Sequence, residues 1–172
     1  MEHILYLHGL DSYPNSNKVS ALTQNYLVHA PHINYRDDGV WNYLEGIFYE
    51  MQPDQIIGSS MGGYFAMLLE LNNLNGDIPT KLTLINPAIH SRSFEPQIPD
   101  RVRILDSFER WRLPGLLVLG KDDDVIDHQK TRDMFIEHQG LLSMDCVIYD
   151  GGHRITNEQF VDVLGSNGYL IK

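Results

Sequence analysis

Short apolar runs alternate with amphipathic stretches along this chain of 172 residues. The apolar runs predict strands over residues 4–7, 27–33, 55–59, 81–85, 116–120 and 145–149. Helical spacing of apolar residues predicts helices over residues 17–26, 40–52, 60–73 and 127–138, and a last helix opened by the capping box of Thr156 and Gln159. Strands that alternate with helices form parallel sheets covered on both faces. We therefore expect a three-layer, doubly wound α/β fold with a mostly parallel sheet, built as one domain over residues 1–172.

Some local features refine this pattern. Asn75-Gly76 and Gly140 are expected to end the third and fourth helices. Residues 87–114 contain several prolines and arginines and show little periodicity, which predicts an irregular excursion or a small cap. The stripe of the second helix is expected to face inward; it consists of Val40, Tyr43, Leu44, Ile47 and Met51.

The composition narrows the classes of function. Hydrophobic residues make up 42% and charged residues 21%, values typical of globular proteins. The net charge is −10 and the basic residues are scattered, so we expect no nucleic-acid partner. The sequence shows neither an apolar stretch long enough for a membrane span nor a signal-peptide pattern at Met1-Glu2-His3, and its single cysteine, Cys146, lies in an apolar run that predicts a buried thiol. We therefore expect a cytoplasmic location.

The segment Gly58-Ser59-Ser60-Met61-Gly62 fits the G-x-S-x-G pattern. A predicted strand precedes it and a predicted helix follows it, which is the context in which this motif presents a nucleophilic serine on a strained turn. Small residues two positions before and after the serine let the strand and the helix pass closely. Ser60 would also lie at a helix N-terminus, where free N–H groups favour a developing negative charge.

A serine hydroxyl needs a base, and a histidine imidazole titrates in the appropriate pH range. The histidines at or near predicted strand ends are His8, His90, His128 and His153. His153 follows the last strand in a Gly-Gly-His loop, and the chain order serine, acid, histidine favours it as the base.

The acid that orients the base is expected among Asp122, Asp123 and Asp124, after the fifth strand. We favour Asp123, because it precedes the apolar pair Val125-Ile126, which is expected to pack inward; Asp122 is the alternative. A calcium loop fits this stretch poorly, because Gly and Glu are absent from the positions that an EF-hand requires. The other site for the acid, at the end of the preceding strand, holds Asn86, which carries no charge.

Two backbone N–H groups are expected to bind the oxyanion of the reaction. One is that of Met61, directly after the serine, and the other is that of Leu10, in the loop that follows the first strand. Gly9 would let this loop approach the substrate closely. His8 is expected to organise the loop through hydrogen bonds.

These motifs resemble the α/β-hydrolase superfamily and, more narrowly, the YqiA/YcfP-like small bacterial serine esterases. The resemblance spans nearly the whole chain, and its specific islands are residues 5–12, the serine turn with Tyr64-Phe65-Ala66, Asn86-Pro87-Ala88 and residues 123–127. It implies hydrolysis of acyl esters or thioesters by a triad that maps onto Ser60, Asp123 and His153. It also implies a compact sheet without the first strands of larger hydrolases and with little lid. Residues 89–114 depart from the family pattern, so the acyl pocket and the substrate are not defined.

The sequence therefore predicts a serine esterase that needs no cofactor or metal and acts on a small acyl ester. One alternative is an acyl-CoA thioesterase, which would need a basic patch for the CoA phosphates. Its candidate residues are Arg92, Arg101, Arg103, Arg110 and Arg112. A more distant alternative is a non-catalytic binding module with the same fold.

Overall fold

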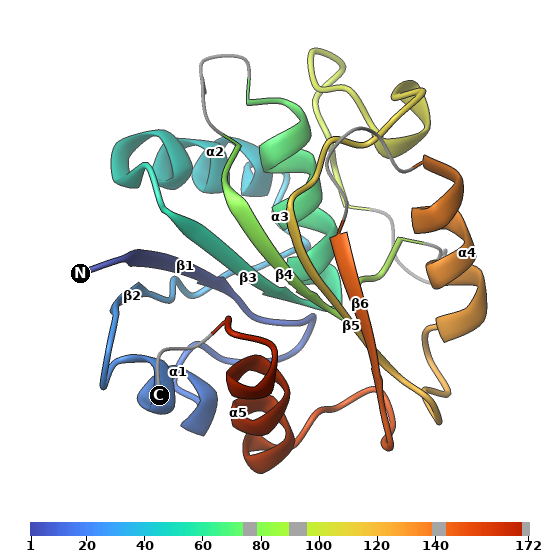
Figure 1. Cartoon of the computed structure of the whole chain (residues 1–172). Helices are drawn as coiled ribbons and strands as arrows, with labels where there is room; N and C mark the ends of the chain where they lie inside the picture. The colour runs from blue at the N-terminus through green and yellow to red at the C-terminus, as the bar shows by residue number, and fades with distance from the viewer. Residues whose placement is uncertain (74–78, 90–95, 139–143, 170–172) are drawn as a thin grey trace.

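The computed structural model describes residues 1–73, 79–89, 96–138 and 144–169 (Figure 1). Its centre is a six-stranded sheet with the order β2-β1-β3-β4-β5-β6, in which every neighbouring pair of these strands is parallel. The strands are β1 (His3–Leu7), β2 (Leu27–His29), β3 (Gln55–Ser59), β4 (Lys81–Ile85), β5 (Gly115–Gly120) and β6 (Met144–Tyr149). The predicted parallel α/β sheet is confirmed.

Helices cover both faces of this sheet (Figure 1). α2, α3 and α4 lie on one face, and α1 and α5 lie together on the other. The helices are α1 (Asn17–Leu22), α2 (Val40–Met51), α3 (Met61–Leu71), α4 (His128–His138) and α5 (Asn157–Ser166), and one 3-10 turn, η1, spans Leu105–Ser107. The arrangement is the three-layer fold that the sequence predicts.

Two hydrophobic clusters, one on each face of the sheet, form the core. Successive strand residues point to opposite faces. Ile56 accordingly belongs to the cluster under α2 and α3, whereas Ile57 belongs to the cluster under α1 and α5. Because both faces are covered, the central strands read as continuous apolar runs.

Two elements are shorter than predicted, and a third presents a different face to the core. α1 ends at Leu22 rather than near residue 26, and β2 ends at His29, before Pro31, which cannot donate to a strand ladder. In α2 the inward face includes Trp41 and Phe48, while Tyr43 is 48% exposed. The two large aromatic side chains take the buried positions, so the helix is rotated relative to the predicted stripe.

The expectation that the thiol of Cys146 is buried is wrong, because its side chain is exposed. It lies on β6, an edge strand of the sheet, where Asp145 and Ile148 are exposed as well. An apolar run on an edge strand need not be buried on both sides. The expected helix ends at Asn75-Gly76 and Gly140 lie outside the described residues.

Residues 96–114 contain η1 and pack at the end of α3 that is remote from Ser60. The side chain of Asn72, which caps the C-terminus of α3, bonds with the backbone N–H and C=O of Arg103. Five side chains of residues 96–114 are buried in the cluster on the α3 face: Val102, Leu105, Phe108, Trp111 and Leu113. Within the described ranges, no helix combines the length and the apolar character that a membrane span requires.

Glu70, near the C-terminus of α3, is a partly buried acid whose Oε2 atom has no hydrogen-bond partner among the described residues. Burial raises the pKa of its carboxyl from 4.5 to about 7, against a smaller opposing effect of hydrogen bonds with Thr80. Because the folded pKa exceeds the unfolded one, the folded chain holds this proton more tightly. The stabilisation that the protonated Glu70 carboxyl gives the folded state is therefore complete below about pH 4.5 and is lost as the pH rises through about 7.

We predict that Glu70→Gln flattens this pH dependence. Between about pH 5.5 and pH 8 the wild type should lose about 1–2 kcal/mol more stability than the variant in urea unfolding, a figure reduced for the partial exposure of the group. Glu50→Gln, at an exposed position of α2, is the matched control and should leave the wild-type slope unchanged. Equal slopes in wild type and Glu70→Gln would contradict the assigned burial effect.

Candidate active site

Ser60 occupies the sharp turn between β3 and α3. Its backbone has φ 52° and ψ −117°, a strained conformation for a non-glycine residue, as the motif predicts. A Cβ on Gly58 would lie 2.5 Å from the carbonyl oxygen of Gly62, and a Cβ on Gly62 would overlap the carbonyl oxygen of Leu7. Both glycines are therefore required by the close passage of strand and helix.

The neighbouring strand β4 holds this turn in place. The N–H of Ser60 donates to the carbonyl of Ile85 at 2.9 Å, and the carbonyl of Ser60 accepts from the N–H of Ala88 at 3.0 Å. The same carbonyl accepts from the N–H of Gly63 at 2.9 Å. These bonds join the turn to both ends of the segment that follows β4, which offsets the backbone strain.

Ser60, His153 and Asp123 come together at the carboxyl ends of three different strands. His153 Nε2 lies 3.0 Å from Ser60 Oγ, and His153 Nδ1 lies 2.9 Å from Asp123 Oδ2. A carboxylate only accepts hydrogen bonds, so Nδ1 carries the proton and Nε2 is free to accept from the serine hydroxyl. The structure thus brings all three residues singled out in the sequence into one hydrogen-bonded line.

The carboxylate of Asp123 is held rigidly in the turn after β5. Its side chain is 0% exposed, against 18% for His153, and its Oδ1 accepts from the N–H groups of Val125 and Ile126 at 2.8 Å each. Asp122 and Asp124 are exposed, and only the backbone N–H of Asp122 reaches the histidine loop, at Gly151. Of these three aspartates, Asp123 is the one whose carboxylate bonds to the His153 ring. Of the apolar pair expected to pack inward, Ile126 is buried, whereas Val125 is 57% exposed, so the expectation is correct for Ile126 alone.

Asn86 holds the acid turn and the histidine loop together, a role that the sequence analysis did not assign. Its Oδ1 accepts from the N–H of Gly120 at 2.7 Å, and its Nδ2 donates to the carbonyl of His153 at 2.9 Å and to the hydroxyl of Tyr149 at 2.9 Å. It is buried at the end of β4 with φ 43°, a conformation that asparagine tolerates better than most residues. The signal was an Asn-Pro pair directly after a strand, with the asparagine at the alternative position for the acid.

The two expected oxyanion donors lie in the segments that flank Ser60. Met61 is the first residue of α3, so its N–H has no partner within the helix. The loop after β1 runs against the serine: a Cβ on Gly9 would lie 3.4 Å from Ser60 Cβ. Neither the N–H of Met61 nor that of Leu10 donates to another described residue.

His8 organises this loop. The N–H of Ile33 donates to its Nε2 at 3.1 Å, which places the ring proton on Nδ1, 2.8 Å from the carbonyl of Gly9. The hydroxyl of Tyr35 donates to the backbone carbonyl of His8 at 2.6 Å. Burial lowers the pKa of His8, so the buried ring is held in its neutral form. Both ring nitrogens are occupied, and His8 is not available as a base.

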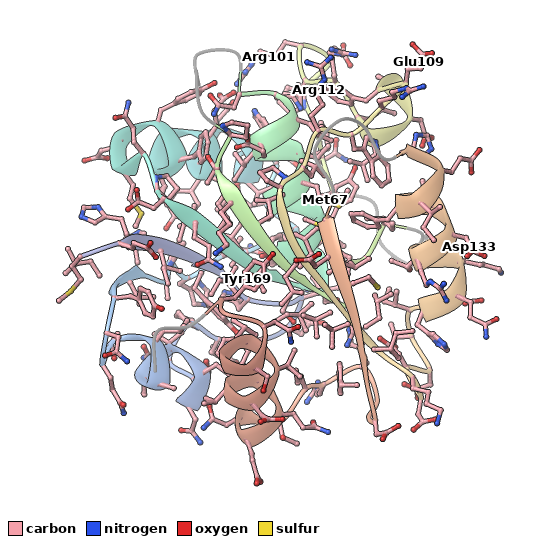
Figure 2. All side chains as sticks on the ribbon, in the orientation of Figure 1. Met67, Arg101, Glu109, Arg112, Asp133 and Tyr169 are labelled. Atoms are coloured by element: carbon pink, nitrogen blue, oxygen red, sulfur yellow. The ribbon has the colours of Figure 1, made fainter. Side chains whose placement is uncertain are left out.

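The arginines considered for CoA phosphates lie elsewhere. Arg101 pairs with Glu45 on α2 at 2.6 Å, and Arg103 lies over the ring of Phe108. Figure 2 shows Arg101 and Arg112 at the end of the molecule where α3 finishes, away from the carboxyl ends of the strands. Arg110 is exposed, and Arg92 and His90 lie outside the described residues.

In the described part of the chain, no group of three or more His, Cys, Asp or Glu side chains is placed to hold a metal ion.

Comparison with known proteins agrees with this architecture. A model of the "Uncharacterised protein family (UPF0227)" matches residues 3–114. A protein of Xanthomonas campestris pv. campestris assigned to the alpha/beta hydrolase superfamily is 21% identical with a TM-score of 0.68, over 96% of this chain and 99% of that one. The monoacylglycerol lipase of Paleococcus ferrophilus is 15% identical with a TM-score of 0.73, over 95% of this chain and 92% of that one. The type II thioesterase BorB of the borrelidin biosynthetic cluster is 17% identical with a TM-score of 0.73, over 96% and 89%.

The solved structures share the fold of this chain, and the family match spans more than half of its sequence. The expected resemblance is confirmed by the family match in sequence and by the shared α/β-hydrolase fold. The chain belongs to the UPF0227 family and has the α/β-hydrolase fold.

Proposed function

We propose that this protein is a serine esterase that hydrolyses carboxylic esters through an acyl-enzyme on Ser60. The observation that carries the proposal is the continuous hydrogen-bonded line from the Ser60 hydroxyl through His153 to the buried carboxylate of Asp123. This arrangement serves nucleophilic catalysis. A serine hydroxyl is a weak nucleophile until a base takes its proton, and the imidazolium that then forms is stabilised by the buried carboxylate.

In the first half of the reaction, Ser60 Oγ attacks the ester carbonyl while His153 Nε2 takes the hydroxyl proton. The Asp123 carboxylate stabilises the imidazolium that forms and keeps the ring in its reactive orientation. The carbonyl oxygen becomes an oxyanion, which the N–H groups of Met61 and Leu10 bind. His153 then returns the proton to the leaving alcohol as the ester C–O bond breaks.

In the second half, His153 takes a proton from a water molecule, whose oxygen attacks the acyl-enzyme carbonyl. The tetrahedral species collapses, Ser60 Oγ recovers the proton and the carboxylic acid leaves. Every step uses residues of this chain and water.

The same line of residues would also cleave a thioester, which differs only in its leaving group. The described arginines considered for CoA recognition contact α2, the C-terminus of α3 and η1, or are exposed, so they give the thioesterase alternative no support. Comparison of an acyl-CoA with an aryl ester of the same acyl length separates the two. We expect the aryl ester to be hydrolysed with the higher kcat/KM.

We predict that Ser60→Ala abolishes ester hydrolysis. With a panel of 4-nitrophenyl esters of increasing chain length, kcat/KM should fall at least about 10³-fold, because no nucleophile remains. Ser107→Ala, in η1, is the matched control and should retain wild-type activity. Turnover that survives in Ser60→Ala would remove this serine from the mechanism, and wild type without any esterase activity would favour the non-catalytic binding module.

A second prediction separates the two adjacent aspartates. Asp123→Asn should lower kcat/KM by about 10³–10⁴-fold, because the amide cannot stabilise the imidazolium and permits the wrong ring tautomer. Asp122→Asn alters the neighbouring exposed carboxylate and should change kcat/KM less than about twofold. The reverse order of effects in steady-state assays would transfer the role of the acid to Asp122.

A further inference from the structure

A cavity of about 340 Å³ opens beside the catalytic line on the α1 and α5 side of the sheet. His153 and Ser59 form one wall, together with the loop after β1 that carries Gly9 and Leu10. The remaining lining is Tyr6, Asp11, Ser12, Tyr13, Ser16, Lys18, Arg154 and Ile155. Its volume is near the lower end of small-molecule sites, and a group bound in it would be next to the catalytic imidazole.

Two cationic side chains line this cavity, and neither has an ion-pair partner among the residues that the structure describes. No carboxylate of the described residues lies within 4.0 Å of the Lys18 ammonium or the Arg154 guanidinium. The one acid of the lining, Asp11, pairs with Arg36 at 2.6 Å. The lining therefore has a net positive charge in a chain whose net charge is −10.

The remaining polar groups of the lining are also suited to bind an anion. The hydroxyls of Ser12, Tyr13 and Ser16 can donate to an oxyanion, and Arg154 follows the catalytic His153 directly in one loop. Partial burial lowers the pKa of Lys18, because the ammonium loses part of its hydration and no carboxylate of the described residues pairs with it. An anion bound beside the ammonium would stabilise its charged form.

We propose that this cavity binds an anionic group, a carboxylate or a phosphate, that the ester substrate carries on its acyl or its alcohol side. The inference rests on the proposed esterase activity and adds the substrate class: small anionic esters, held by Lys18 and Arg154 while Ser60 attacks. Repulsion by the acidic protein surface would otherwise disfavour such substrates, so local cations are needed for their capture.

The test uses two pairs of chromogenic esters. In the alcohol pair, 3-acetoxy-4-nitrobenzoate is compared with its neutral amide, 3-acetoxy-4-nitrobenzamide. In the acyl pair, the 4-nitrophenyl monoester of succinate is compared with its neutral methyl ester. We expect the anionic member of one pair to have a kcat/KM about tenfold higher than its neutral partner, and the pair that shows this preference identifies the side that carries the charge.

The variants connect this preference to the cavity. Lys18→Gln and Arg154→Gln should each reduce the ratio of the anionic to the neutral kcat/KM by about threefold to tenfold. Lys130→Gln removes the same charge from an exposed position of α4 and should preserve the ratio. Lys18→Arg should retain the preference, because the charge is kept. Raising the salt concentration should weaken the preference in wild type.

The outcomes distinguish the two proposals. Hydrolysis of all four esters with equal kcat/KM for charged and neutral members would overturn the anion site and leave the esterase intact. A preference that Lys18→Gln and Arg154→Gln do not change would also overturn it. No hydrolysis of any ester, neutral ones included, would instead contradict the esterase itself.

Discussion

The hydrogen bond between His153 Nδ1 and the buried carboxylate of Asp123 fixes the remainder of the site. It sets the tautomer of the imidazole and leaves Nε2 as an acceptor for the Ser60 hydroxyl. The two partners belong to different loops, after β6 and after β5, so the bond can form only if these loops are held in register. Asn86 provides this register from the end of β4, because it bonds to the last residue of β5 and to the backbone carbonyl of His153.

The second constraint is the turn at Ser60. Its positive φ is unfavourable for serine, and hydrogen bonds from the segment after β4 compensate for it. The glycines on either side let α3 pass close to β3 and to the end of β1. The parallel sheet therefore does more than bury apolar surface: the strand ends bring Ser60, His153 and Asp123 together at one edge, next to the loop after β1.

Features that depend on local order along the chain were predictable from the sequence. The strands and the turn at Ser60 follow from periodicity and from the G-x-S-x-G spacing, and the capping box at Thr156 forms as expected. The side chains of Ser60, Asp123 and His153 meet, as their order along the chain led us to expect. Features that depend on tertiary placement were not. The orientation of α2 was decided by competition among its large side chains, and the exposure of Cys146 by the edge position of β6. The clamp formed by Asn86 and the meeting of Lys18 with Arg154 join residues far apart in sequence, which no spacing rule relates.

The central claim is that His153 activates Ser60 as a nucleophile. Its most direct test is the covalent trapping of the serine with a fluorophosphonate, followed by peptide mass mapping and measurement of the labelling rate. The account predicts one adduct on Ser60 in the wild type and labelling slowed by at least about 10²-fold in His153→Ala, because the hydroxyl then lacks its base. An adduct on another residue, or labelling of Ser60 at the same rate without the imidazole, would contradict the claim.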